Sequence, residues 1–100
     1  MSVTVLVKFV VDPAVFGALL SERAEEFAKI SGDGKAQGCL HHQFVAGDDH
    51  VLAVDEWESA DAFQKFFANQ TEIPVLMQAG GVSTPPEVTV YQSLNSADSF

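Results

Sequence analysis

Residues 3–11 read Val-Thr-Val-Leu-Val-Lys-Phe-Val-Val and run directly into Asp12-Pro13. This run of β-branched and apolar side chains is too continuous for a strand with one face in water, so it predicts a strand buried on both sides. Asp12 can cap the free amides of a helix, and Pro13 suits the first helical position. A helix is therefore expected to start there and to cover one side of a sheet.

The same signals divide the rest of the chain. Apolar residues at three- and four-residue spacing carry this helix to about Ile30, and the glycine-rich stretch 31–35 is expected to be a loop. The remaining predicted elements are a hairpin of strands 39–45 and 50–57, a helix capped by Ser59, a short helix over 73–79 ended by Gly80-Gly81, and a strand over 87–94.

Strand, helix, strand, strand, helix, strand is the order of a ferredoxin-like α+β fold, with a four-stranded antiparallel sheet and the helices on one face. The other face is also apolar, at residues 3–11 and 51–54, and it needs a cover. A second copy packed face to face across a two-fold axis would supply one, so we expect a homodimer built as an α+β barrel. Residues 1–100 are expected to form a single domain with its core in 3–94 and a loose tail over 95–100.

Composition narrows the choice of partners and location. Among 100 residues, 14 Asp and Glu face only five Lys and Arg, and the net charge is −9. This charge repels phosphate backbones and anionic lipid headgroups, so neither nucleic acid nor a membrane is an expected partner. The single cysteine cannot form an internal disulfide, and neither a signal peptide nor an apolar run of about 20 residues is evident, which favours the cytoplasm.

The neighbouring histidines 41 and 42 are the main candidates for chemistry. Alternation along a strand points them to opposite faces: Leu40, His42 and Phe44 share one face, and Cys39, His41, Gln43 and Val45 share the other. Whichever histidine faces the helices would lie among phenylalanines, where it can be a neutral general base or a hydrogen-bonded structural residue. His50 is expected to be solvated beside Asp48 and Asp49.

Other chemistries find less support. The histidines lack the spacing of a metal site, the Ser31–Gly34 stretch lacks the features of a phosphate loop, and Cys39 has no nucleophile motif around it. Most of the aromatic residues can be core. Trp57 ends its strand at the expected mouth between the sheet and the second helix, where an indole ring can line a ligand cavity.

Two stretches of the sequence resemble a known protein family. Gln37-Gly38-Cys39-Leu40 and the segment from Val54 to Phe63, with its Glu56-Trp57-Glu58, resemble the antibiotic biosynthesis monooxygenase family, and the likeness extends over about 3–94. The resemblance implies a dimeric α+β barrel with a cavity between each sheet and its helices. Characterised relatives oxidise polycyclic phenols or quinols with molecular oxygen and without a metal or flavin, and one branch degrades haem.

The resemblance also implies roles for residues of this chain. His42 or His41 would be the base, Asp55 its partner, and Trp57 the residue that stacks on the substrate ring. The aromatic residues expected to line the substrate cavity with Trp57 are Phe44, Phe63, Phe66 and Phe67. Haem-degrading relatives carry an Asn in the first strand and a His on the second helix. This chain has neither, and Phe66 takes the place of that His, so no haem or other cofactor is expected.

Two functions follow as hypotheses. The first is a cofactor-independent monooxygenase of an aromatic or quinol-like small molecule. The alternative is a barrel protein of the same fold that binds a small apolar ligand without catalysis, or that catalyses a non-oxidative reaction. They differ in whether a base and a hydrogen-bond donor converge on the cavity beside Trp57.

Overall fold

Four strands and four helices follow one another along residues 2–100, which are the residues that the computed structural model describes. The strands are β1 (Val3–Val10), β2 (Cys39–Ala46), β3 (His50–Trp57) and β4 (Glu87–Gln92). The helices are α1 (Pro13–Glu22), α2 (Ala24–Ala36), α3 (Ala60–Asn69) and α4 (Glu72–Ala79). None of the helices in this part of the chain is long and apolar enough to cross a membrane.

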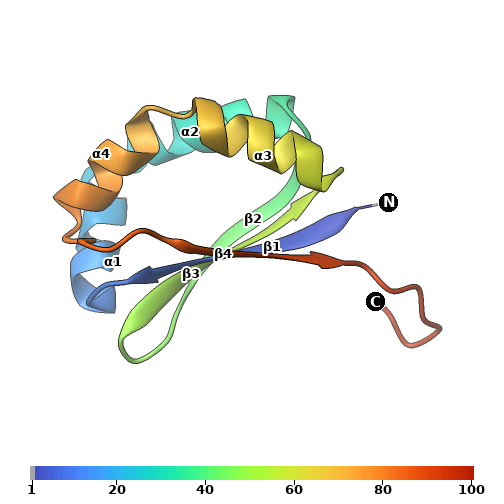
Figure 1. The fold of residues 1–100 in the computed structure, drawn as a ribbon. Coiled ribbons are helices and arrows are strands. Elements are labelled where there is room, and N and C mark those ends of the chain that lie inside the picture. Colours follow the sequence, from blue (N-terminus) through green and yellow to red (C-terminus); the bar gives the residue numbers. More distant parts are fainter. Residues whose placement is uncertain (1) are drawn as a thin grey trace.

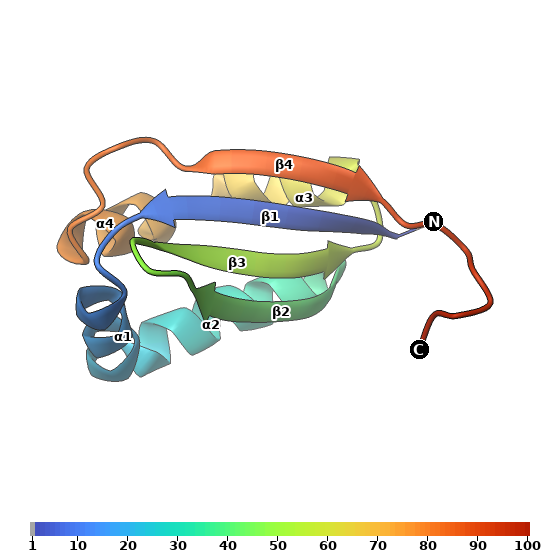
Figure 2. The same cartoon turned by 90° about the horizontal axis from the view of Figure 1, so that it is seen from below.

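The strands form an antiparallel sheet in the order β2-β3-β1-β4. The two central strands pair along their whole length, from Val3 opposite Trp57 to Val10 opposite His50. The helices lie on one side of this sheet (Figure 1), with α2 behind β2 and α3 behind β1 and β4 (Figure 2). The ferredoxin-like α+β fold predicted from the sequence is confirmed.

The core lies between the sheet and the helices. Every second residue of β1 from Val3 to Phe9 is buried, and the residues between them, such as Leu6, remain partly exposed on the opposite face. Strand β3 repeats this pattern from Val51 to Trp57. In a single chain, therefore, the central strands are covered on one side, whereas the sequence predicted burial on both.

The helical region before β2 differs from the predicted helix and loop. The helix breaks at Arg23, and a second helix then continues through the expected loop at 31–35 as far as Ala36. Glycine is unfavourable inside a helix by about 1 kcal/mol relative to alanine, but tertiary packing overrides this preference. Gly34 is buried against Trp57 and Phe66. The turn into β2 instead uses Gly38, whose φ of 117° suits glycine.

The predicted helix caps are present. The Asp12 carboxylate accepts a hydrogen bond from the Ala14 amide at 2.9 Å, and the Ser59 hydroxyl accepts one from the Ala62 amide at 3.1 Å. Helix α4 ends at the predicted Gly80-Gly81, where Gly81 has a φ of 87°. These caps set where α1 and α3 begin, and α3 carries aromatic side chains into the core.

The extent of α2 can be tested at Gly32, whose Cβ position is open space. Gly32→Ala should raise the free energy of unfolding by about 0.5–1 kcal/mol, because alanine restricts the unfolded chain and favours the helix. Gly38→Ala should lower the free energy of unfolding, because the backbone at position 38 has a positive φ that alanine disfavours. Urea unfolding followed by circular dichroism measures both, and a loss of stability in Gly32→Ala would contradict the helix.

Candidate functional site

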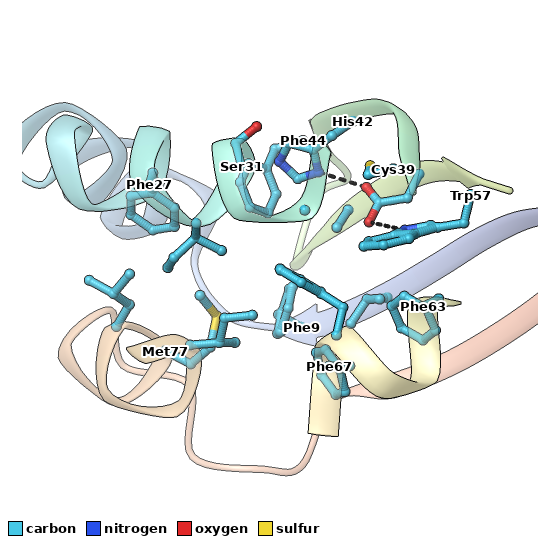
Figure 3. Close-up of a pocket in the computed structure, with 18 residues that line it drawn as sticks. Phe9, Phe27, Ser31, Cys39, His42, Phe44, Trp57, Phe63, Phe67 and Met77 are labelled. Carbon is cyan, nitrogen blue, oxygen red and sulfur yellow. Dashed lines mark hydrogen bonds and ion pairs between the residues drawn. The ribbon is translucent and has the colours of Figure 1, made fainter. Parts of the chain in front are cut away.

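A cavity of about 80 Å³ lies between the sheet and helices α2, α3 and α4 (Figure 3). Phe27 and Ile30 of α2 line one side, and Ile73 and Met77 of α4 line another. Phenylalanines of α3 close a third side. Its walls are therefore mostly apolar, as expected for a site that takes a small organic ligand.

One end of the cavity is polar and centres on Asp55 of β3. The Asp55 side chain is 11% exposed, and its Oδ2 accepts a hydrogen bond from Trp57 Nε1 at 3.2 Å. Its Oδ1 lies 2.6 Å from His42 Nδ1 (Figure 3). Among residues 2–100, no group of three or more His, Cys, Asp or Glu side chains is arranged to hold a metal ion.

Strand geometry brings these three side chains together. Asp55 and Trp57 are two residues apart on β3 and so share one face of the sheet. His42 pairs with Asp55 across the β2–β3 ladder, so the two side chains are direct neighbours on that face. The local backbone pairing thus places a carboxylate, an imidazole and an indole N–H beside the cavity.

His42 is held in one orientation by two contacts. Asp55 engages Nδ1, and the edge of the ring packs on Phe44 with centroids 4.8 Å apart. A carboxylate at Nδ1 favours the tautomer with its proton there, which leaves Nε2 of the neutral ring as an acceptor. The side chain is 32% exposed and lines the cavity, so Nε2 can accept a proton from a bound molecule.

The other two histidines lie elsewhere. His41 is exposed and belongs to the opposite face of the sheet, where it pairs with Glu56. His50 is the first residue of β3, directly after the hairpin turn, and its Nδ1 lies 2.8 Å from Asp49 Oδ1, a hydrogen bond that lowers the pKa of the Asp49 carboxyl. Of the described histidines, His42 is the one that lines the cavity.

The sequence placed Cys39 on the wrong face. Strict alternation grouped it with His41, but the β2–β3 register shifts between Cys39 and His41, and Cys39 lines the cavity with His42. An irregularity of this kind adds a residue to one strand and breaks the alternation of faces. The thiol donates to the His41 carbonyl at 3.3 Å, and burial together with the Asp55 carboxylate raises its pKa.

Trp57 lies deeper than its expected position at the mouth of the cavity. Its side chain is 1% exposed and forms an inner wall, with the Phe63 ring edge-on at 5.6 Å and the Phe66 ring tilted at 5.1 Å. The residues that were expected to line the cavity with it all do so: Phe44, Phe63, Phe66 and Phe67.

The cavity also has lining residues that the sequence did not mark. The helical spacing of Phe27 and Ile30 indicated that they face the sheet, but nothing indicated that they face a space. Gly34 was assigned to a loop, so its place in the wall was hidden. The residues from α4 lay on a short helix whose orientation the sequence left open.

The comparison with known proteins concerns the fold. No protein-family model matches the chain, and no curated protein matches its sequence. Among solved structures, SnoaB, a cofactor-independent oxygenase from Streptomyces nogalater, matches with a TM-score of 0.64 and 18% identity, covering 98% of both chains. The ActVA-Orf6 monooxygenase of Streptomyces coelicolor, in complex with nanaomycin D, matches with a TM-score of 0.69 and 19% identity, covering 95% of this chain and 89% of that one.

A third structure, a candidate antibiotic biosynthesis monooxygenase from Bordetella bronchiseptica, matches with a TM-score of 0.66 and 19% identity over 94% of this chain and 98% of that one. These structures confirm the likeness that the Gly38-Cys39 and Glu56-Trp57 stretches indicated. The chain has the fold of the antibiotic biosynthesis monooxygenases over nearly its whole length. Sequence identities of 18–19% show a shared fold, but they do not show a shared substrate or reaction.

The raised pKa of the Cys39 thiol allows the burial of the polar end of the cavity to be tested. Iodoacetamide reacts with the thiolate, so the pH midpoint of alkylation should lie higher in the folded protein than in urea, because burial and Asp55 disfavour the charge. By linkage, stability should fall as pH rises past the ordinary thiol pKa. Mass spectrometry of alkylation rates measures the midpoints. Asp55→Asn should lower the alkylation midpoint of the folded protein, but not as far as the midpoint in urea, because burial of the thiol remains. Equal midpoints in the folded and the unfolded protein would contradict the described burial.

Proposed function

We propose that this protein is a cofactor-independent monooxygenase that oxidises an aromatic or quinol-like small molecule in the cavity. The observation that carries the proposal is the hydrogen-bonded set of His42, Asp55 and Trp57 at one end of an otherwise apolar space. The shared fold with SnoaB, a cofactor-independent oxygenase, and with the ActVA-Orf6 monooxygenase supports it.

The chemistry needs little from the protein. A hydroxyarene with hydrogen on the carbon para to its hydroxyl reacts with O₂ to give the para-quinone and water. Once deprotonated, the electron-rich ring can itself reduce O₂. The site therefore has to supply an apolar pocket that excludes water and a base beside the hydroxyl.

The steps can be assigned to His42. Its Nε2 takes the phenolic proton, and the phenolate passes one electron to O₂. The aryloxyl radical and superoxide then join through a new C–O bond at the para carbon, and the peroxide takes the proton back from His42. His42 next removes the para hydrogen as a proton while the O–O bond breaks, and the departing hydroxide takes that proton and leaves as water.

Asp55 and Trp57 act on His42 rather than on oxygen. The carboxylate orients the imidazole and stabilises the imidazolium that forms when Nε2 is protonated. The Trp57 N–H occupies the second carboxylate oxygen and holds Asp55 in place. Trp57 also presents its indole as a wall for the substrate ring.

Oxygen consumption with catechol, 1-naphthol and anthrone tests the proposal. His42→Ala should lower kcat about 10²-fold or more, because general-base catalysis contributes about that much. His42→Gln can still donate to Asp55 but cannot act as the base, so it should lose activity with the fold intact. The matched control is His41→Ala, the adjacent histidine on the opposite face, which should leave kcat unchanged.

Equal activity in the wild type, His42→Ala and His42→Gln would exclude His42 as the base. Binding of these compounds to the wild type without oxygen uptake beyond the protein-free rate would favour the alternative function, a barrel protein that binds an apolar ligand without oxidising it.

A second copy of the chain is the partner we propose for the uncovered face of the sheet. Within residues 2–100 the helices occupy the other face (Figure 1). The uncovered face carries partly or fully exposed apolar side chains on all its strands: Leu6, Val45, Leu52, Val54 and Tyr91. Leu6 and Val54 pair directly at its centre. Face-to-face packing of two such sheets would bury these side chains at once.

Size-exclusion chromatography with light scattering tests the homodimer. The wild type should elute with twice the mass of one chain, and Leu6→Glu should convert it to a monomer, since the new carboxylate would be buried without a partner. Val15→Glu adds the same charge at an exposed position on α1 and should remain dimeric. A monomeric wild type at micromolar concentration would contradict the proposal, as would a dimeric Leu6→Glu.

A further inference from the structure

Among the described residues, one polar side chain lines the cavity from the helix side, and it is Ser31 of α2. The residues of α2 that face the cavity recur at helical spacing: Phe27, Ile30, Ser31 and Gly34. Serine is a poorer helix former than alanine. Helix stability therefore gives no reason for a hydroxyl in this otherwise apolar stripe.

Ser31 lies at the same end of the cavity as the proposed base (Figure 3). The ring nitrogen of His42 that does not engage Asp55 is on the side of Ser31 in this view. Both side chains line the cavity, and both are accessible, because Ser31 is exposed and the His42 side chain is 32% exposed. A ligand oxygen at this end can thus meet the imidazole from β2 and the hydroxyl from α2.

The other hydrogen-bond donors around the cavity already have partners in the protein. Trp57 Nε1 donates to Asp55 at 3.2 Å, and the Cys39 thiol donates to a backbone carbonyl at 3.3 Å. The Nδ1 of His42 is also engaged by Asp55. Within residues 2–100, the Ser31 hydroxyl has no such partner. It is therefore the donor that is free for a ligand.

We infer that Ser31 is a second catalytic residue, whose hydroxyl donates a hydrogen bond to the substrate oxygen that His42 deprotonates. This role rests on the proposed function for the reaction. The phenolic proton moves to Nε2 of His42, and Ser31 keeps its own proton. A phenolate in a mostly apolar cavity is unfavourable unless donors replace its hydration. The imidazolium is one donor and Ser31 is the other, so the anion that reduces O₂ is stabilised from two sides.

The same pair selects the oxygen group of the substrate. A hydroxyl on an aromatic ring can donate to Nε2 of His42 and accept from Ser31 at once. An aryl methyl ether has no proton to donate, and its oxygen never becomes an anion that a donor would stabilise. The cavity is therefore expected to bind phenols in preference to their methyl ethers.

4-Nitrophenol tests this role without turnover, because its electron-poor ring does not reduce O₂. Its phenolate is yellow and the neutral phenol is not, so visible absorbance gives the ratio of phenolate to phenol in the bound compound. Ser31→Ala should lower this ratio about ten-fold, because a hydrogen bond to a charged oxygen is lost. The wild type should bind 4-nitroanisole, the methyl ether, more weakly than 4-nitrophenol, and Ser31→Ala should leave binding of the ether unchanged.

Two further variants control for effects on the fold. Ser21→Ala makes the same change in α1, outside the cavity, and should leave 4-nitrophenol binding unchanged. Ser31→Thr keeps a hydroxyl and should retain the bound phenolate. Alanine favours a helix over serine, so the loss in Ser31→Ala cannot come from unfolding. With 1-naphthol as substrate, Ser31→Ala should also lower kcat for oxygen uptake about ten-fold.

An unchanged ratio of bound phenolate to phenol in Ser31→Ala would overturn the role of Ser31, as would a wild type that binds no 4-nitrophenol. An equal loss in Ser31→Thr and Ser31→Ala would also overturn it, because the hydroxyl would then not be the cause. A ten-fold effect on bound 4-nitrophenol, with no oxygen uptake from catechol, 1-naphthol or anthrone by the wild type, would overturn the proposed oxygenase. Ser31 would then stand as a binding residue for phenols.

Discussion

The buried carboxylate of Asp55 constrains the site more than any other group. A carboxylate removed from water costs several kcal/mol unless hydrogen bonds replace its hydration. Asp55 has one partner from its own strand, Trp57, and one from the neighbouring strand, His42. The β2–β3 pairing, the side of the sheet that His42 occupies and the burial of Trp57 are therefore linked. A change in any one of them would remove at least one of the two hydrogen bonds that the buried carboxylate makes.

The same constraint separates the two ends of the cavity. The polar partners all lie on the sheet, whereas α2, α3 and α4 contribute almost only apolar side chains. A base is thus presented by rigid strands, and the ring of a ligand is enclosed by helices. Because Asp55 and Phe44 both contact the imidazole of His42, the ring presents Nε2 for proton transfer in a defined direction.

Most of the fold was predictable because its signals are local. The apolar run at 3–11, the caps at Asp12 and Ser59, and the Gly80-Gly81 stop each act within a few residues. The site was only partly predictable, because its residues depend on long-range contacts. Alternation could show that His41 and His42 point to opposite faces, but which face meets the helices is set by the whole sheet. The register shift after Cys39 and the helical state of Gly34 arise from packing between elements and leave no local signal.

Helix α2 illustrates how packing at the site competes with local preference. Gly32 and Gly34 both cost helix stability, and the neighbouring Asp33 is also a weak helix former, so the segment has the local character of a loop. It is helical because one side of it packs against the sheet, and on that side only Gly34 is buried among Trp57, Phe66 and Cys39. An alanine there would favour the helix, and its methyl group would lie in contact with those three side chains. The absent side chain at position 34 thus weakens α2 locally and lets the helix backbone lie close to Trp57, Phe66 and Cys39.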